Sequence, residues 1–168
     1  MSTVQLDTKE RAARVLSYLR QFKTDRGAMA DLRCVLSPAK MSRAWPLLAP
    51  IGGIGNPRIE IVAGLFAYHP EEIKNGNMGA TCRTLQTGHN SFDGRFRRLL
   101  VCDRDEICER LRPVIFAAKA KGVGINYEQL LVDLYRWNTN VKARWAREYW
   151  SEAEGERPES LTGSEAEG

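Results

Sequence analysis

The sequence predicts an all-α protein, a compact helical bundle of about seven to nine helices with no significant β-sheet. Apolar residues recur three and four positions apart through most of the chain, which is the period of an amphipathic helix. No segment alternates polar and apolar residues over any length, as a half-buried strand would. With 168 residues, of which 43% are hydrophobic, the chain is long enough to bury a core of its own.

The first helix is expected at about residues 8–22. Asp7 followed by Glu10 matches a capping box, in which side chains satisfy the free backbone N–H groups of a helix start. The apolar face of this helix comprises Val15, Leu16, Leu19 and Phe22. A turn near Gly27 leads to a short second helix, which presents Leu32, Val35 and Leu36 to the core and Arg33 elsewhere.

A third helix is expected to start at Ser37 and Pro38, because serine favours the N-cap position and proline the first helical position. Pro46 should kink or end this helix, since proline lacks the backbone N–H that a helix interior needs. A glycine-rich loop at residues 50–57 then separates it from the next element.

Asn56 is predicted to cap a fourth helix, which ends at His69. One face of that helix carries Ile61, Val62, Leu65 and Phe66. The NGNMG stretch at residues 75–79 has the composition of a flexible segment, so an irregular connector is expected there.

The phrase SFDGRFRRLL starts another helix at Ser91. Asp103 and Glu106 form a second capping box, and the helix after it should reach Gly122, with a bend at Pro113. Its inner face comprises Ile107, Leu111, Val114, Ile115 and Ala118.

A third box, formed by Asn126 and Gln129, starts a final helical segment that runs toward Trp150. Whether this segment breaks near residues 138–140 stays open. Trp137 and Trp145 share a helical face with Val141, so they are predicted to pack in the core.

The chain divides by charge into a helical body at residues 1–150 and an acidic tail at residues 151–168. The tail holds six Glu and one Arg, a net charge of −5, so the body carries +9. The tail has too few apolar residues to offset its ordering entropy and is predicted to be disordered. Whether the body consists of two helical subdomains that meet near residues 70–90 stays open.

The acidic tail has two possible roles. It either competes with phosphate for the basic body or extends into solvent without a function. Deleting residues 151–168 and measuring nucleic-acid affinity separates these two roles. If the tail competes with phosphate, its deletion should raise the affinity, and if it has no function, the affinity should not change.

Several classes of function lose support from what the sequence lacks. No apolar window approaches the length of about 20 residues that a membrane span needs, and the N-terminus has no secretory signal, so a cytoplasmic protein without a membrane partner is expected. The four cysteines and two histidines show no metal-ligand spacing; the cysteines should be free thiols, and His69 and His89 surface or capping side chains. No catalytic motif or cofactor motif is present, which predicts a non-enzyme with no cofactor and no metal.

Basic residues interleave with aromatic residues on two of the expected helices. The chain has 18 Arg and 7 Lys, and arginine presents a planar set of donors that suits phosphate. One group comprises Arg95, Phe96, Arg97 and Arg98, and the other comprises Arg136, Trp137, Lys142, Arg144, Trp145 and Arg147. Such groups can hold a nucleic-acid backbone without sequence preference.

The order of these motifs is also familiar. RFRRLL at residues 95–100, LRP at 111–113 and YEQLLVDLYRW at 127–137 resemble the CasB family, the small subunit of the type I-E CRISPR Cascade complex. ADLRCVL around Arg33 and the Asn56–Arg58 segment support the N-terminal half. The resemblance covers about residues 5–150; the GGIG loop and the Glu-rich tail depart from it.

The resemblance implies an all-helical, non-catalytic subunit of an RNA-guided surveillance complex. Such a subunit associates head to tail with a second copy, contacts the large and backbone subunits, and stabilises the displaced strand of the target DNA in an R-loop. The candidate nucleic-acid contacts that it implies are Arg33, Arg58, Arg97, Arg98, Arg112, Lys142 and Arg144.

Two other classes stay open on the sequence. A structural adaptor would use its basic face only for protein assembly. A helical DNA-binding regulator would need a recognition helix in the major groove, and the sequence shows no short turn between two helices that marks one.

Overall fold

A computed structural model describes residues 2–87 and 92–151 of the chain. Over these residues the protein consists of nine α-helices and three 3-10 helices. The described residues form no β-strand, and their β-type pairing is limited to one isolated bridge between Glu72 and Ile125. The structure therefore confirms the predicted all-α class.

The order of elements along the chain is as follows. The α-helices are α1 (Ser2–Arg20), α2 (Arg26–Arg33), α3 (Trp45–Leu48), α4 (Pro57–Tyr68), α5 (Met78–Gln86), α6 (Phe92–Leu100), α7 (Glu106–Lys121), α8 (Tyr127–Tyr135) and α9 (Thr139–Trp150). The 3-10 helices are η1 (Cys34–Leu36), η2 (Pro38–Ala44) and η3 (Ala49–Ile51).

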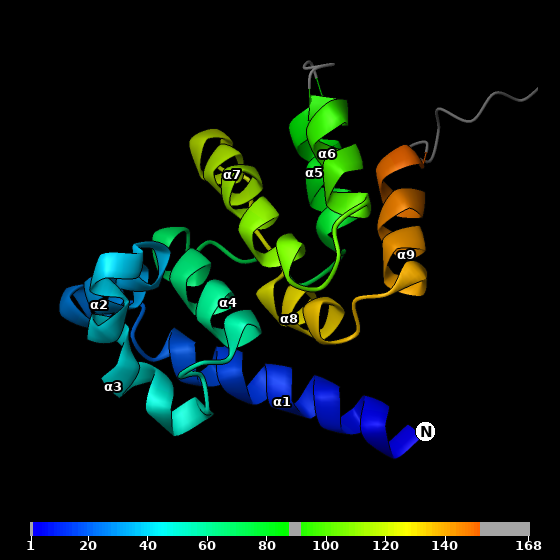
Figure 1. The fold of residues 1–168 in the computed structure, drawn as a ribbon. Coiled ribbons are helices and arrows are strands. Elements are labelled where there is room, and N and C mark those ends of the chain that lie inside the picture. The colour runs from blue at the N-terminus through cyan, green and yellow to red at the C-terminus, as the bar shows by residue number, and fades with distance from the viewer. Residues whose placement is uncertain (1, 88–91, 152–168) are drawn as a thin grey trace, which may run out of the picture.

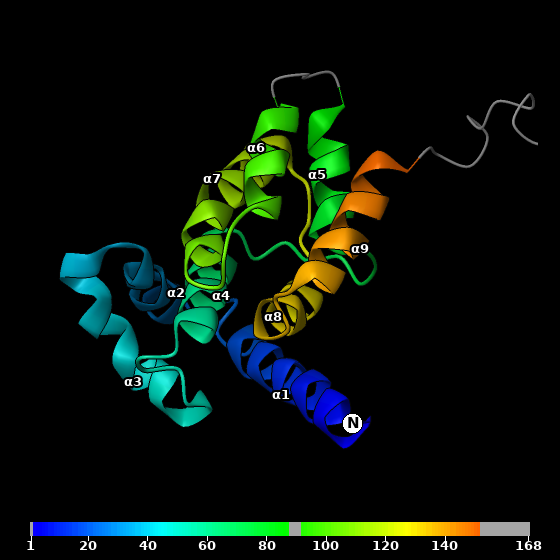
Figure 2. The same cartoon turned by 45° about the vertical axis from the view of Figure 1, so that its right-hand side comes forward.

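Helices α4 and α8 occupy the centre of the molecule (Figure 1). Helix α1 packs against α8, and α2 and η1 pack against α4 on one side, where η2 contacts α2 and η1. On the other side α5, α6, α7 and α9 stand next to one another, as the turned view in Figure 2 also shows. The basic helices α6 and α9 are thus far from α2.

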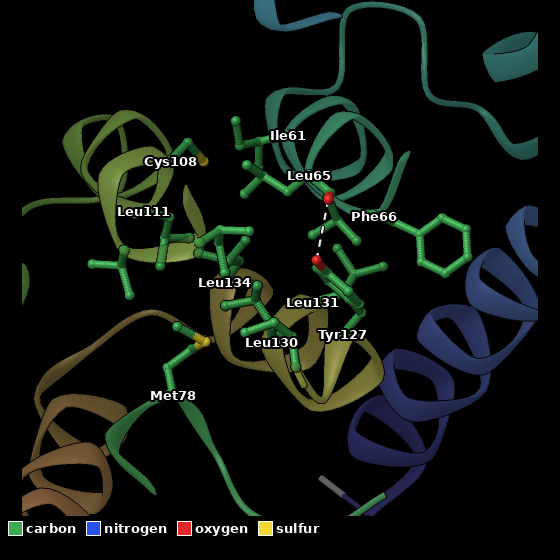
Figure 3. Packing of buried hydrophobic residues seen from close by; sticks show 14 of the residues in the cluster. Ile61, Leu65, Phe66, Met78, Cys108, Leu111, Tyr127, Leu130, Leu131 and Leu134 are labelled. Atoms are coloured by element: carbon green, nitrogen blue, oxygen red, sulfur yellow. Dashed lines mark hydrogen bonds between the residues drawn. The ribbon is translucent and has the colours of Figure 1, made fainter. Parts of the chain in front are cut away.

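The core is centred on α4, which is buried along almost its whole length. Figure 3 shows Ile61 and Leu65 of α4 among the apolar side chains of α7 and α8. The hydroxyl of Tyr127 donates to the Leu65 carbonyl at 3.1 Å and to the His69 carbonyl at 2.6 Å. Two carbonyls at the end of α4 are therefore satisfied inside the core.

Three of the predicted helix starts are confirmed by their side-chain caps. The Asn56 amide oxygen accepts from the backbone N–H of Arg58 at 3.2 Å. The Asn126 oxygen accepts from Gln129, and the Asp103 carboxylate accepts from Glu106, at 3.2 and 2.9 Å. Each cap satisfies a backbone donor that the helix itself leaves free.

Two other predicted caps are wrong. Helix α1 begins at Ser2 and runs through Asp7, which therefore caps nothing. Ser37 makes no capping hydrogen bond, and the segment after it is the 3-10 helix η2 instead of an α-helix. Pro46 and Pro50 remove backbone donors shortly afterwards, which favours short helical pieces over one regular helix.

The connector expected at residues 75–79 is shorter than predicted, because Asn77 caps α5 and Met78 and Gly79 are helical. The final helical segment does break: α8 ends at Tyr135, and Asn138 caps α9 from Thr139. The predicted core packing of Trp137 and Trp145 is confirmed, since both are buried.

His69 was predicted to be a surface or capping side chain, and of these two alternatives the surface position is wrong. It lies at the C-cap of α4, but its ring is buried at 4% exposure, with Nε2 2.6 Å from the Val123 carbonyl oxygen. His89 lies outside the described residues. The four cysteines are free thiols, and three of them are buried.

The acidic tail beyond Ser151 also lies outside the described residues, so its predicted disorder and the two-subdomain division stay predictions. Among the helices that the structure describes, none has the length and apolar content to cross a bilayer.

Candidate nucleic-acid interface

A basic groove runs between α6 and α7. Helix α6 buries Phe92, Phe96 and Leu99, so Arg95 and Arg98 lie at its edge beside α7. Arg110 of α7 faces them. The groove has a volume of about 240 Å³ and is lined by Arg95, Arg98, Leu99, Arg110, Pro113 and Val114. We refer to these six residues as the α6–α7 groove.

The charge of the α6–α7 groove is not balanced by any carboxylate in its lining. Two of the three acidic residues on these helices pair with other arginines: Asp93 with Arg97 at 2.7 Å and Glu109 with Arg112 at 3.5 Å. The third, Glu106, is not part of the groove lining. Among the described residues, none of the three groove arginines has an ion-pair partner. Three like charges repel one another, so an anion in the groove would relieve this repulsion.

A second basic site, the α8–α9 cleft, lies beside α1. It has a volume of about 470 Å³ and is lined by Lys9, Lys74, Asn75, Gly76, Asn77, Asn126, Gln129, Asp133, Arg136, Arg144 and Glu148. Four of these side chains are cationic and two are acidic, so its charge is mixed.

Asp133 forms the buried side of this cleft. Its carboxylate accepts from Trp145 Nε1 at 2.8 Å and from Gln129 Nε2 at 2.9 Å. Burial raises the pKa of Asp133, although both hydrogen bonds and the nearby Arg144 and Arg136 act in the opposite direction. The carboxyl therefore anchors α9 to α8, and its two oxygens are already occupied.

The seven candidate residues from the sequence do not share one helical face. Arg98 lines the α6–α7 groove and Arg144 lines the α8–α9 cleft. Arg33 is exposed at the end of α2, on the opposite side of the molecule (Figure 1). Arg97 leaves α6 on its other side, where it pairs with Asp93. The candidates therefore lie on separate surfaces of the described structure, and their role in nucleic-acid binding stays a prediction.

Three of the candidates are held by contacts within the fold. Arg58 Nε donates to the Leu134 carbonyl at 3.1 Å, which links α4 to α8. Arg112 Nη2 donates to the Leu36 carbonyl at 2.6 Å, which links α7 to η1. Lys142 is partly buried, with Nζ 5.6 Å from the centre of the Trp137 ring. These side chains have structural partners in addition to any nucleic acid.

Sequence reasoning missed Lys9, Lys74 and Arg110, which the fold places at the two basic sites. Helical periodicity shows which residues share a face of one helix, but not which helix lies opposite. No signal in the sequence pairs Arg110 with Arg98, so these residues could not be found from it.

No group of three or more His, Cys, Asp or Glu side chains that could hold a metal ion occurs within residues 2–87 and 92–151. The three arginines of the α6–α7 groove lie on helices, and such cationic side chains suit the binding of a polyanion through its backbone.

Known proteins share this chain's sequence and fold. Residues 28–150 match the family of CRISPR-associated protein Cse2. A curated Cse2 protein from Thermus thermophilus is 37% identical over 123 residues, which are 67% of this chain and 71% of the relative. The crystal structure of CasB from Thermus thermophilus has a TM-score of 0.70 at 29% identity and covers 84% of this chain and 98% of its own.

A chain from a CRISPR RNA-guided surveillance complex has the same fold. Its TM-score is 0.69 at 20% identity, over 94% of this chain and 98% of the other. The match of the family over most of the chain, and the identity to the curated relative, confirm the resemblance found in the sequence. This chain belongs to the CRISPR-associated Cse2 family, to which the CasB proteins are similar.

Proposed function

We propose that this protein is the non-catalytic small subunit of a type I-E Cascade complex and binds the backbone of the displaced DNA strand. Its partners are the large and backbone subunits and a second copy of itself, arranged head to tail. Membership of the Cse2 family and the fold shared with a chain of an RNA-guided surveillance complex support this assignment. The observation that carries the nucleic-acid part is the uncompensated charge of the α6–α7 groove.

A small number of phosphate contacts is enough for this role. Exchanging a DNA duplex for an RNA–DNA hybrid is nearly balanced in free energy, so contacts to the displaced strand can tip it. Guanidinium groups form strong, paired hydrogen bonds with phosphate oxygens. Arg95, Arg98 and Arg110 have donors free for such bonds, since the described chain supplies them with no carboxylate.

Purification of the tagged protein from its host tests the assembly. We expect the other subunits and a guide RNA to co-purify, and sequencing should match that RNA to repeat–spacer DNA. Recovery of the protein alone, or of proteins unrelated to an RNA-guided complex, would contradict the assignment.

The salt dependence of binding tests the phosphate contacts. For a single strand, the logarithm of the affinity should fall with the logarithm of the salt concentration by roughly 0.7 for each phosphate engaged. The double variant Arg98→Gln and Arg110→Gln should therefore flatten the slope by up to about 1.4. Fluorescence anisotropy with a labelled single-stranded oligonucleotide over a salt series measures this.

Arg43→Gln is a control outside the groove, which removes one positive charge where the double variant removes two. Arg43 is exposed in η2, on the α2 side of the molecule, so its loss removes a charge but not a groove contact. The control should keep the wild-type slope. A wild-type affinity that does not depend on salt would reject phosphate binding.

The same variants separate the two rival functions. If the protein is an adaptor, the groove variants will weaken assembly and leave the nucleic-acid affinity unchanged. If it is a DNA-binding regulator, the wild type will prefer one duplex sequence, which backbone contacts alone do not produce.

A further inference from the structure

A cluster of three aromatic side chains joins α6 to the end of α9. The rings of Phe96 and Tyr149 stack with centroids 3.9 Å apart and an interplanar angle of 18°. Trp150 meets both rings at a steep angle, with centroids 5.4 Å from Phe96 and 5.0 Å from Tyr149. Phe96 and Tyr149 are buried, so the indole of Trp150 rests on a fixed apolar base.

Trp150 nevertheless stays 46% exposed. The guanidinium of Arg97 lies 5.0 Å from the centre of its ring, in a cation–π contact. The ion pair with Asp93 at 2.7 Å holds Arg97 in that place. A large aromatic ring that is immobilised, exposed and next to a cation is the arrangement on which single-stranded nucleic acids stack their bases.

We refer to the exposed ring of Trp150 with the Arg97 guanidinium as the Trp150 platform. The Trp150 platform and the α6–α7 groove lie on two sides of α6. Arg97 and Arg98 are adjacent in the sequence, so their side chains leave α6 about 100° apart. Arg98 points to the groove beside α7, and Arg97 points to Trp150 of α9. A strand that crosses the exposed side of α6 can therefore reach both sites.

We propose that Trp150, together with the Arg97 guanidinium that lies over its ring, stacks against an unpaired base of a single strand whose backbone lies in the α6–α7 groove. This inference rests on the proposed function and adds that the protein contacts a base of the displaced strand as well as its backbone. Bases in a duplex are stacked on one another and paired, so they cannot use the platform. Charge complementarity with the groove favours nucleic acid as the occupant over an uncharged partner.

An abasic strand tests the platform, because it keeps the phosphates and lacks the bases. The full-length protein should bind a mixed-sequence oligonucleotide at least about fivefold more tightly than an abasic strand of equal length. Trp150→Ala should abolish this difference and leave the affinity for the abasic strand unchanged. Arg98→Gln should instead lower both affinities by the same factor.

Two matched variants control for the fold. Trp150→Phe keeps an aromatic ring and should keep most of the preference for bases. Trp45→Ala removes the other exposed tryptophan of the described residues, which is 43% exposed at the start of α3 and far from α6. This variant should keep the whole preference for bases. Equal affinity of the wild type for both strands would overturn the platform while leaving backbone binding intact. Binding of neither strand would overturn the proposed function as well.

Tryptophan fluorescence gives a second test, which does not require Trp150→Ala to fold. In a Trp45→Phe protein, Trp150 is the exposed tryptophan of the described residues. The oligonucleotide, but not the abasic strand, should protect it from acrylamide quenching. If the oligonucleotide gives no protection and deletion of residues 152–168 increases quenching, the acidic segment covers Trp150 and the inference is wrong.

Discussion

Replacing Gly79 with alanine should lower the free energy of unfolding by about 3 kcal/mol. Helices α5 and α9 cross at Gly79, where a Cβ atom would overlap the Trp145 carbonyl oxygen and lie 2.7 Å from its carbonyl carbon. These are backbone atoms of α9, which cannot rotate away as a flexible side chain could. Trp145 is fully buried, so α9 cannot shift without disturbing the core. Urea unfolding of the variant measures the loss.

Gly94→Ala is the matched control. Gly94 lies within α6, and a Cβ atom there meets nothing within 4 Å. In a helix interior, alanine is more favourable than glycine by up to about 1 kcal/mol, so this variant should be slightly more stable than the wild type. If the two variants change stability by the same amount, the close crossing of α5 and α9 is not what requires glycine at position 79.

Replacing Asp133 with alanine should cost about 2 kcal/mol, because it leaves buried donors without an acceptor. Trp145 Nε1 and Gln129 Nε2 both donate to this carboxylate, and Asp133 is only 2% exposed. Asp133→Asn keeps one acceptor oxygen and should cost less. Gln129→Ala, which removes one of the two donors, should also cost less than Asp133→Ala.

The stability conferred by Asp133 should also depend on pH. Burial raises its pKa above the ordinary value of 3.8, so the folded protein keeps this proton at pH values where the unfolded chain has lost it. The stabilisation that comes from this retained proton on Asp133 is therefore fully present below the ordinary pKa, and it is lost as pH rises through the raised pKa of the folded state. Asp133→Asn does not titrate. The free-energy advantage of the wild type over it should shrink from acidic to neutral pH, and a constant advantage would contradict the argument.

Local sequence patterns predicted much of the helical framework. Asn56, Asp103 and Asn126 cap helices as expected, because a cap bonds backbone groups two or three residues away. The buried faces of α4 and α7 likewise follow from apolar spacing within one helix. At Gly79 the local pattern does not predict the structure. The composition NGNMG favours a loop, but the close approach of α9 makes glycine useful inside a helix.

The candidate site was predicted less completely, because local sequence patterns do not show which helices pack together. Arg98 and Arg144 were identified from their own helices, whereas Arg110 becomes part of the site only because α7 packs beside α6. Arg58 and Arg112 look equally basic in the sequence. Each donates to a backbone carbonyl 76 residues away, so their partners are set by long-range packing.

The sequence by itself determined the all-α class, several helix starts, the excess of positive charge in the body and the family resemblance. These properties depend on residues within a few positions of one another or on composition. Only the tertiary structure decided which arginines stay free, which are tied to carbonyls, and where Trp150 meets Arg97. Those outcomes depend on which helices pack together, and helical periodicity describes one helix at a time.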